Sequence, residues 1–307
     1  MTIGMIFVVG SLHYDIVVDA PKLPSLDETV MGGPMRFVCG GKGGNQAVAA
    51  SLHGAGVHFG GIVGHDRFGD ALIENLRKCG VDCSQVIRSN DAVSGASVAI
   101  IDKDGGYGAV VASGANQSIA ADDFVIPDET EILVLQNEIP ERACFGLAEK
   151  ARSAGVKIVL NAAPWRRFET KILEVADILV VNRVEASGMF GDQIDSVDQS
   201  LTSLRDRPIP LGCAVITLGD DGLVFADDGG EPEYLPSFDV PVISTHGAGD
   251  AFVGAMCAEL LLGSATNGAL AYASAAAALH VSTPVENRLS IDRDQTLAFM
   301  ASAHLRS

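Results

Sequence analysis

The chain has 307 residues, of which 48% are hydrophobic and 6% aromatic, and its formal net charge is −18 at pH 7. This composition is typical of a closely packed α/β enzyme and excludes a disordered chain. The strong negative charge argues against nucleic acid or an anionic membrane surface as a partner.

The N-terminal segment MTIGMIFVVG is predicted to form the first strand of the fold. It has neither a basic flank nor a cleavage site, which argues against a signal peptide. No window of the chain approaches the ~20 apolar residues of a membrane span. The six cysteines lack C-x-x-C and zinc-finger spacing, so we interpret them as buried small residues in a reducing compartment. We therefore expect a cytoplasmic protein without a membrane partner.

Two segments, residues 12–38 and 94–113, show strand-like alternation without a helical pattern. The first contains several prolines, and the second is predicted to be a hairpin around DKDGG. Each segment is too small to form a core of its own. We predict that they pair as a small β-sheet that projects from the main body and serves as a lid, a dimer surface or both.

The segment CGGKGGNQAVAA, residues 39–50, places four glycines around Lys42 and Asn45 before a helix. The missing side chains would let a small polar ligand lie against the backbone, while Lys42 and Asn45 would donate hydrogen bonds to its hydroxyl groups. The alternative is a flexible glycine loop with a surface lysine.

Helices and strands alternate over most of the remaining chain. A helix is predicted over residues 66–80, where apolar residues recur at helical spacing before a glycine. Later come four continuous apolar runs, EILVLQ, VKIVLN, DILVVN and AVITLG. Such strands are buried on both faces, as in a parallel sheet covered by helices. We expect one domain over residues 1–307, a three-layer α/β/α fold with a mostly parallel central sheet and the projecting lid.

The segment STHGAGDAFVGA, residues 244–255, combines a glycine turn with the start of an apolar helix. Gly247 and Gly249 would let backbone N–H groups converge into a nest for an anion. The helix adds its unpaired N-terminal N–H groups and the positive end of its dipole. This pattern predicts a site for phosphate charge.

Asp250 follows this turn directly, and we interpret it as a general base that takes the proton of an attacking hydroxyl, a contribution of ~10²–10⁴ in rate. The alternative is that Asp250 only caps its helix. Other phosphate motifs are missing. Gly41-Lys42 is followed by Gly43, so there is no P-loop, and the first strand is not followed by dinucleotide-binding glycine spacing.

GGKGGNQAVAA and THGAGDAFVGA together resemble the two signatures of the ribokinase-like (PfkB) carbohydrate kinases, in the expected order and separation. The resemblance covers nearly the whole chain. It includes VVGSLHYDIVVDAPKLPSLDETV, VASGAN, LVLQNEIP, LNAAP, VNRVEA and ITLGDDG. It implies the ribokinase-like α/β/α fold and an ATP-dependent phosphotransferase that uses Mg²⁺.

The resemblance also implies roles for the residues that match the family motifs. Asp250 would be the catalytic base, and the anion hole would be formed by Gly247, Ala248 and Gly249. The sugar would be contacted by His13, Asp15, Gly41, Lys42, Asn45 and Glu138. The nucleotide would be contacted by Asn182, Thr217, Gly219 and Gly222, while Glu185 would act on Mg²⁺ through water.

Two departures from the family pattern concern specificity and cations. The family's ribokinase branch usually has Asn where this chain has His13, which leaves open a substrate other than ribose. Potassium-activated members carry Asp-Thr before the glycine turn and a glycine in a later loop. Here the corresponding positions read Ser244-Thr245 and VSTPVENRLS. A hard cation would lose its carboxylate ligand, so we expect weak or absent potassium dependence.

The sequence therefore favours an ATP-dependent kinase that phosphorylates a primary hydroxyl of a small sugar, ribose or similar, and that forms a homodimer through the lid. The alternative within the superfamily is a nucleoside kinase of the pseudouridine or adenosine type. That activity would need an apolar slot for the base, which Tyr14 and Phe37 could supply. A non-catalytic sugar-binding regulator and a phosphohydrolase are the rivals from other classes.

Overall fold

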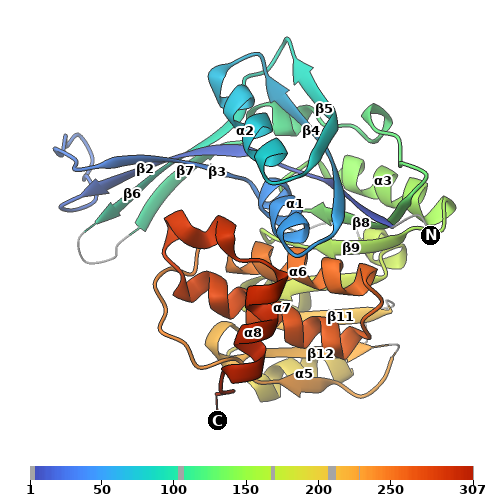
Figure 1. Cartoon of the computed structure of the whole chain (residues 1–307). Coiled ribbons are helices and arrows are strands. Elements are labelled where there is room, and N and C mark those ends of the chain that lie inside the picture. Colours follow the sequence, from blue (N-terminus) through green and yellow to red (C-terminus); the bar gives the residue numbers. More distant parts are fainter. Residues whose placement is uncertain (1–3, 103–106, 167–169, 207–211, 228, 307) are drawn as a thin grey trace.

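The computed structural model describes residues 4–102, 107–166, 170–206, 212–227 and 229–306 (Figure 1). Among these residues, nine strands form the main sheet, in the order β13-β12-β11-β10-β9-β8-β1-β4-β5. Their bounds are β1 Met5–Val9, β4 Gly56–Gly64, β5 Asp82–Ser89, β8 Thr130–Gln136, β9 Lys157–Asn161, β10 Ile178–Asn182, β11 Cys213–Thr217, β12 Leu223–Asp227 and β13 Glu233–Leu235. The neighbours from β5 to β11 pair in parallel, and only β12 and β13 are antiparallel.

The apolar runs become strands because their alternate residues fill two different cores. In β1, for example, Ile6 and Val8 belong to one core, while Phe7 and Val9 belong to the other. The first core is covered by α1 Lys42–Leu52, α2 Arg67–Lys78, α6 Ala248–Leu261 and α7 Thr266–Ser282. The second is covered by α3 Glu141–Ser153, α4 Arg183–Phe190 and α5 Val197–Asp206. The predicted three-layer α/β/α fold is therefore confirmed.

The remaining helices are short or peripheral. Helix α8, Arg293–Ser302, packs against α7 near the C-terminus. The short 3₁₀ helices are η1 Gly114–Ser118, η2 Ala121–Asp123, η3 Thr170–Glu174, η4 Gly219–Asp221 and η5 Val285–Ser290. No helix in the described ranges has the length and apolar character needed to cross a membrane.

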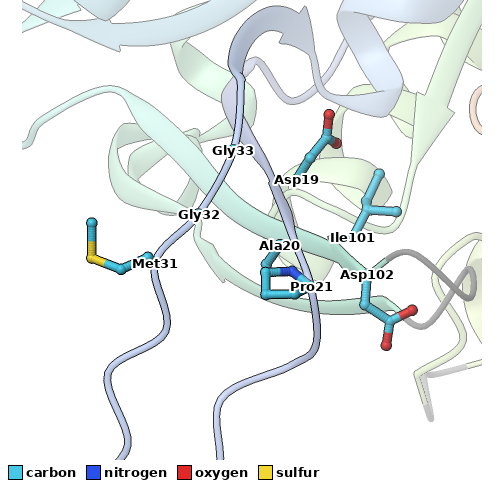
Figure 2. Close-up of a pocket in the computed structure, with 8 residues that line it drawn as sticks. All are labelled: Asp19, Ala20, Pro21, Met31, Gly32, Gly33, Ile101 and Asp102. Carbon is cyan, nitrogen blue, oxygen red and sulfur yellow. The ribbon is translucent and has the colours of Figure 1, made fainter.

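The two predicted lid segments form a separate four-stranded sheet that projects from the main body (Figure 1). Its strands are β2 His13–Ala20, β3 Met35–Gly40, β6 Gly95–Asp102 and β7 Tyr107–Ala112, in the order β3-β2-β6-β7. The β2–β6 pair is parallel, and the β2–β3 and β6–β7 pairs are antiparallel. Residues 103–106 of the predicted DKDGG turn lie outside the described residues. At the free end of the lid, Asp19, Met31 and Asp102 are among the residues that line a hollow of about 430 Å³ (Figure 2).

Helix α1 begins earlier than the sequence indicates. It starts at Lys42, so Gly43 and Gly44 lie in its first turn instead of in a loop before it. A Cβ at Gly43 would lie 2.7 Å from the Cα of Gly10, which explains why this position is a glycine inside a helix. The close approach places the start of α1 directly against the end of β1, where the lid also begins.

Candidate active site

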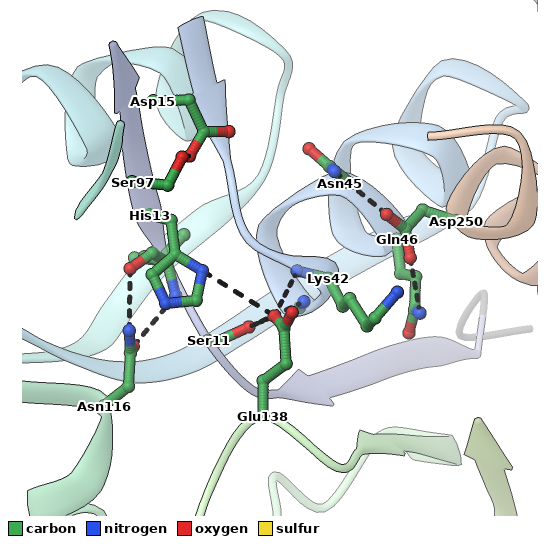
Figure 3. A network of polar contacts seen from close by, with 12 residues as sticks. Ser11, His13, Asp15, Lys42, Asn45, Gln46, Ser97, Asn116, Glu138 and Asp250 are labelled. Atoms are coloured by element: carbon green, nitrogen blue, oxygen red, sulfur yellow. Dashed lines mark hydrogen bonds and ion pairs between the residues drawn. The ribbon is translucent and has the colours of Figure 1, made fainter. Parts of the chain in front are cut away.

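Asp250 lies in the first turn of α6, and its side chain is turned toward α1 (Figure 3). The N-cap of α6 is Gly247, and Asp250 is the third residue of the helix, so the alternative that Asp250 is merely the N-cap is wrong. Its carboxylate accepts hydrogen bonds from Asn45 Nδ2 at 2.9 Å and from Gln46 Nε2 at 3.0 Å. Two side-chain amides from one helix thus fix both carboxylate oxygens.

Gln46 is a site residue that the sequence analysis missed. Its Nε2 atom donates to Asp250 and to Oδ1 of Asn161, each at 3.0 Å, and Asn161 in turn donates to the carbonyl of Val180. These hydrogen bonds tie the acid on α6 to the end of β9 and to the middle of β10. The spacing of Lys42, Asn45 and Gln46 could have revealed the residue, because positions three and four apart share one face of a helix.

The contact between the two helices depends on a small residue. A Cβ at Gly254 of α6 would lie 2.5 Å from the Cβ of Ala49 and 2.6 Å from the carbonyl oxygen of Gln46. Only a glycine lets α1 approach α6 this closely. The reach of Asn45 and Gln46 to Asp250 is a consequence of that approach.

Burial raises the pKa of Asp250 above its usual range, and the positive charge of Lys42 and the two amide hydrogen bonds act against this rise. The side chain is only 6% exposed. A raised pKa makes a carboxylate a stronger base, although a larger fraction of it is then protonated at a given pH. A general base therefore works best when its pKa lies near the working pH. The environment of Asp250 therefore suits proton abstraction.

The glycine turn supplies hydrogen-bond donors beside this base. Gly247 has a φ of 79°, a left-handed conformation that favours glycine, and it is followed by Ala248 and Gly249 in the first helical turn. In the described part of the chain, the N–H of Ala248 donates to Thr245, whereas the N–H groups of Gly247 and Gly249 have no acceptor. Unpaired N–H groups at a helix N-terminus are suited to an anion.

A second group of polar residues lies where the lid meets α1 (Figure 3). Glu138 follows β8, and its Oε2 atom accepts hydrogen bonds from the hydroxyl of Ser11 and from the backbone N–H of Lys42, the latter at 2.9 Å. His13 Nδ1 lies 3.7 Å from the same oxygen, and the Nε2 atom of His13 is buried without a partner in the described residues. Gly41 is needed here, because a Cβ on it would lie 2.7 Å from the Ser11 carbonyl oxygen.

Asp15 lies on the same face of the lid as His13, and it accepts a hydrogen bond from the hydroxyl of Ser97. Burial is the main cause of a raised pKa of Asp15, while Ser97 and the charges of His13 and His246 lower it. Because His246 belongs to the glycine turn, the lid acid and the turn lie close enough to interact. Ser97, Ser11 and Asn116, which pairs with the backbone of Leu12, were not recognised from the sequence.

The aromatic residues considered for a nucleoside base lie on the other face of the lid. Tyr14 alternates with His13 and Asp15 along β2, and Phe37 pairs with Ile16, so both rings point away from the acidic face. Tyr14 stacks on Phe37 and on Phe68 of α2, with ring centroids 5.8 and 4.7 Å apart. They form a packing cluster behind the lid and not a slot beside Asp15.

The residues assigned to the nucleotide come together at the ends of two neighbouring strands. Asn182 ends β10, Thr217 ends β11, and the two are directly paired in the sheet. Gly219 and Gly222 shape the turn after β11 with φ values of 67° and 86°. The carboxyl ends of parallel strands are the usual ligand-binding edge of such sheets.

Asn182 and Glu185 form a reciprocal cap at the start of α4. The Asn182 side chain accepts from the N–H groups of Val184 and Glu185, and Glu185 Oε2 accepts from the N–H of Asn182 at 2.6 Å. Burial raises the pKa of Glu185, and Lys42 lowers it. The charge of Lys42 thus acts on the Glu185 carboxylate at the start of α4 as well as on the Asp250 carboxylate.

The donor set suits a magnesium ion held mainly by other ligands. In the described ranges, no group of three or more His, Cys, Asp or Glu residues gathers to hold a metal. Glu185 offers one carboxylate oxygen beyond its capping bond. Mg²⁺ usually keeps several waters and binds through one or two carboxylates and substrate phosphates. Glu185 therefore fits Mg²⁺ bound together with a nucleotide.

A three-layer fold with a lid, and a buried acid behind a glycine turn, define a small-molecule phosphotransferase. The family model for pfkB family carbohydrate kinases matches residues 4–288, and the chain belongs to this family. It is 34% identical to the ribokinase of Bacillus subtilis over 280 residues, which cover 90% of this chain and 92% of that protein. It is 31% identical to the ribokinase of Haemophilus influenzae, over 96% of this chain and 98% of that protein.

Solved structures agree with these relatives. The structure of Arabidopsis thaliana ribokinase complexed with ribose and ATP matches with a TM-score of 0.89 at 27% identity, covering 97% of this chain and 98% of that chain. The resemblance to the ribokinase-like carbohydrate kinases inferred from the motifs is thereby confirmed.

Proposed function

We propose that the protein is an ATP-dependent kinase that transfers a phosphoryl group to a primary hydroxyl of ribose or a closely related sugar. The observation that carries this proposal is the position of the buried Asp250 carboxylate in the same helical turn as the N–H groups of Gly247 and Gly249. The similarity to ribokinases supports ribose as the first substrate to test.

In the proposed reaction, Asp250 removes the proton of the attacking hydroxyl. Asn45 and Gln46 hold its carboxylate in one orientation. The N–H groups of Gly247 and Gly249 stabilise the charge on the migrating phosphoryl group, whereas the N–H of Ala248, which the sequence assigned to the same anion hole, already donates to the Thr245 carbonyl. Because phosphoryl transfer passes through a loose transition state, such positioning and charge stabilisation supply most of the catalysis.

The sugar is proposed to lie between the lid and α1. Asp15 accepts a hydrogen bond from Ser97, and Glu138 accepts from Ser11 and from the N–H of Lys42. These bonds orient both carboxylates, whose remaining lone pairs can accept hydrogen bonds from sugar hydroxyls. Lys42, Asn45, Gly41 and His13 complete this set. The Tyr14–Phe37 cluster lies on the far face of the lid, which removes the slot expected for a nucleoside and favours a free sugar over the nucleoside alternative.

The nucleotide is proposed to bind along Asn182, Thr217, Gly219 and Gly222. Glu185 would hold Mg²⁺ through water, and the ion would neutralise phosphate charge. Lys42 contributes a positive charge that acts on both Glu185 and Asp250. We propose that the enzyme acts in the cytoplasm and that residues 1–307 work as one domain.

We also propose a homodimer through the lid. Met35, Phe37, Val98 and Val110 share the lid face that carries Tyr14, and they are between 47% and 75% exposed. Four neighbouring large apolar side chains on one sheet face form a surface suited to a second copy.

A product-formation screen with Mg-ATP over ribose, deoxyribose, fructose, adenosine and pseudouridine tests the proposed activity. The expected result is a sugar phosphate from ribose or a related pentose at the highest kcat/KM. Preferential phosphorylation of a nucleoside would overturn the choice of substrate, and no product from any of them would overturn the kinase assignment.

A further inference from the structure

The side chain of Arg288 lies behind the glycine turn and contacts main-chain carbonyls. It is 8% exposed, although it carries a guanidinium group. Its Nε atom donates to the carbonyl of Thr283 at 3.2 Å, Nη1 to His246 at 2.8 Å and Nη2 to Ser244 at 2.8 Å. Within the described ranges it has no carboxylate partner, and burial lowers its pKa. A buried cation is costly unless the surroundings satisfy it, and here three carbonyl dipoles do so.

Two of these carbonyls belong to the turn that leads to Asp250. The carbonyl of His246 shares its peptide unit with the N–H of Gly247. In a trans peptide the carbonyl and the N–H point in opposite directions, and the described chain has its cis bond elsewhere, at Ala163-Pro164. By fixing the His246 carbonyl, Arg288 therefore directs the N–H of Gly247 away from itself, toward the side where phosphate is proposed to bind.

A second donor holds the same carbonyl but adds no charge. His280 Nε2 lies 2.9 Å from the His246 oxygen, and a carbonyl can only accept, so this nitrogen carries the hydrogen. Burial lowers the pKa of His280 to about 4, so the ring is neutral near pH 7. A Cβ at Gly247 would lie 3.1 Å from His280 Nε2, which keeps this position small. The charge behind the turn comes from Arg288.

The arrangement does not fit a bound monovalent cation. Carbonyl oxygens are the ligands that a hard cation would use, but the Ser244, His246 and Thr283 oxygens already accept from the guanidinium. A monovalent cation bound to these carbonyls would also be repelled by the positive charge of the Arg288 guanidinium. The sequence has no carboxylate ligand at Ser244-Thr245, and the guanidinium of Arg288 lies against the carbonyl of Ser244 instead.

We infer that Arg288 is a positioning residue that acts as a built-in cation: it orders the anion-hole turn and makes phosphoryl transfer independent of added potassium. This inference rests on the proposed kinase function. Arg288 touches the turn and not the reacting atoms, so its removal should affect transition-state stabilisation more than sugar binding.

The test compares the wild-type enzyme with Arg288→Ala and Arg288→Lys in sodium and in potassium at constant ionic strength. Wild-type kcat should be equal in the two salts. Arg288→Ala should lose about 10- to 100-fold in kcat, less than the 10²–10³ that follows loss of a direct oxyanion donor, with KM for the sugar essentially unchanged. Guanidinium chloride, far below denaturing concentrations, or potassium should restore part of that loss. Arg288→Lys, which keeps the charge with fewer donors in a fixed plane, should fall in between.

The matched control is Arg152→Ala. Arg152 also donates to a main-chain carbonyl, that of Glu174 at 2.9 Å, but it belongs to α3 on the opposite face of the sheet. This variant should keep wild-type kcat and should not respond to guanidinium or potassium. A loss in both variants would indicate general destabilisation and would overturn the positioning role.

A second measurement does not need turnover. Amide hydrogen exchange of residues 244–250 should become faster in Arg288→Ala and slow again with guanidinium, while exchange in the central strands stays unchanged. A several-fold activation of the wild type by potassium, or an Arg288→Ala enzyme with full activity and unchanged exchange, would overturn the inference. An inactive wild type with the expected exchange pattern would instead refute the proposed function and leave the ordering role of Arg288 supported.

Discussion

The carboxylate of Asp250 and the side-chain amide of Gln46 are joined by a 3.0 Å hydrogen bond between residues 204 positions apart in the sequence. The bond crosses the interface of α1 and α6, and it connects the two glycine-rich segments that stand out in the sequence. Each segment alone is a loop leading into a helix. Together they bring the buried carboxylate of Asp250 within hydrogen-bond distance of the side-chain amides of Asn45 and Gln46.

Replacing Asp250 by Asn should abolish most of the turnover. An amide cannot accept the hydroxyl proton, so kcat should fall by at least ~10²–10⁴, while sugar binding measured by calorimetry stays close to wild type. Asp70→Asn is a suitable control, because Asp70 is an exposed acid of α2 that pairs with Arg88. Full activity of the Asp250→Asn enzyme would show that another group removes the proton.

The acid limb of the pH–rate profile should report the pKa of Asp250. Burial raises this pKa above the ordinary 3.8, so kcat/KM, which reports the pKa values of the free enzyme, should rise with pH through an inflection above that value. The sign of the stability effect follows from the same shift. The folded state binds the proton more tightly than the unfolded state, so the stability contributed by protonated Asp250 is lost as pH rises through the folded pKa.

Stability and kinetics can be compared in the same pH series. The Tm difference between wild type and Asp250→Asn should change with pH between the ordinary pKa of 3.8 and the raised pKa of Asp250 in the folded state. Outside that pH range the difference should be constant. A profile whose inflection is at or below 3.8 would contradict the effect of burial.

Gln46→Ala should lower kcat with little change in KM for the sugar. It leaves one oxygen of a buried carboxylate without a donor, which costs ~1–3 kcal/mol or more for a charged group. Gln46→Glu should be worse, because a second carboxylate beside Asp250 raises its pKa and moves the acid limb to higher pH. Gln85→Ala provides the control, since Gln85 contacts Val125 on the exposed surface. Equal kcat values for Gln46→Ala and Gln85→Ala would exclude a role for the Gln46 contact.

Gly254→Ala should lower both Tm and kcat. The added Cβ would lie 2.5 Å from Ala49, and overpacking of this kind typically costs ~1–3 kcal/mol. The matched control is Gly268→Ala in α7, where nothing lies within 4 Å of the added Cβ. That substitution should stabilise the protein by up to ~1 kcal/mol, because Ala is a better helix former than Gly. If both variants melt alike, the close α1–α6 contact is not what Gly254 provides.

Phe37→Asp should convert the proposed dimer to a monomer. Phe37 is 52% exposed on the apolar lid face, and a buried aspartate at a dimer interface would be unpaired. Sedimentation velocity of wild type, Phe37→Asp and the control Val125→Asp measures this directly. Val125 is 75% exposed but lies away from the lid. A wild-type protein that is monomeric at all concentrations would rule out the lid interface.

The sequence was informative where local pattern determines structure. The apolar runs predicted the parallel strands, and the Gly247–Asp250 segment predicted a helix start with free N–H groups. The start of α1 was placed too late, because glycine is a poor helix former and the contact of Gly43 with Gly10 cannot be seen in one segment. Gln46 and Arg288 were missed for a related reason, since their partners belong to distant elements.

Helix α1, an 11-residue element, contributes to two tasks at once. Its first N–H holds Glu138 on the side proposed to bind the sugar, and its next turn holds Asp250 on the side proposed to bind phosphate. A substitution that tilts this helix to admit a different sugar would therefore misalign the base as well. Engineering of a new acceptor range should begin instead at Ser97, whose hydroxyl contacts Asp15 of the lid and not α1.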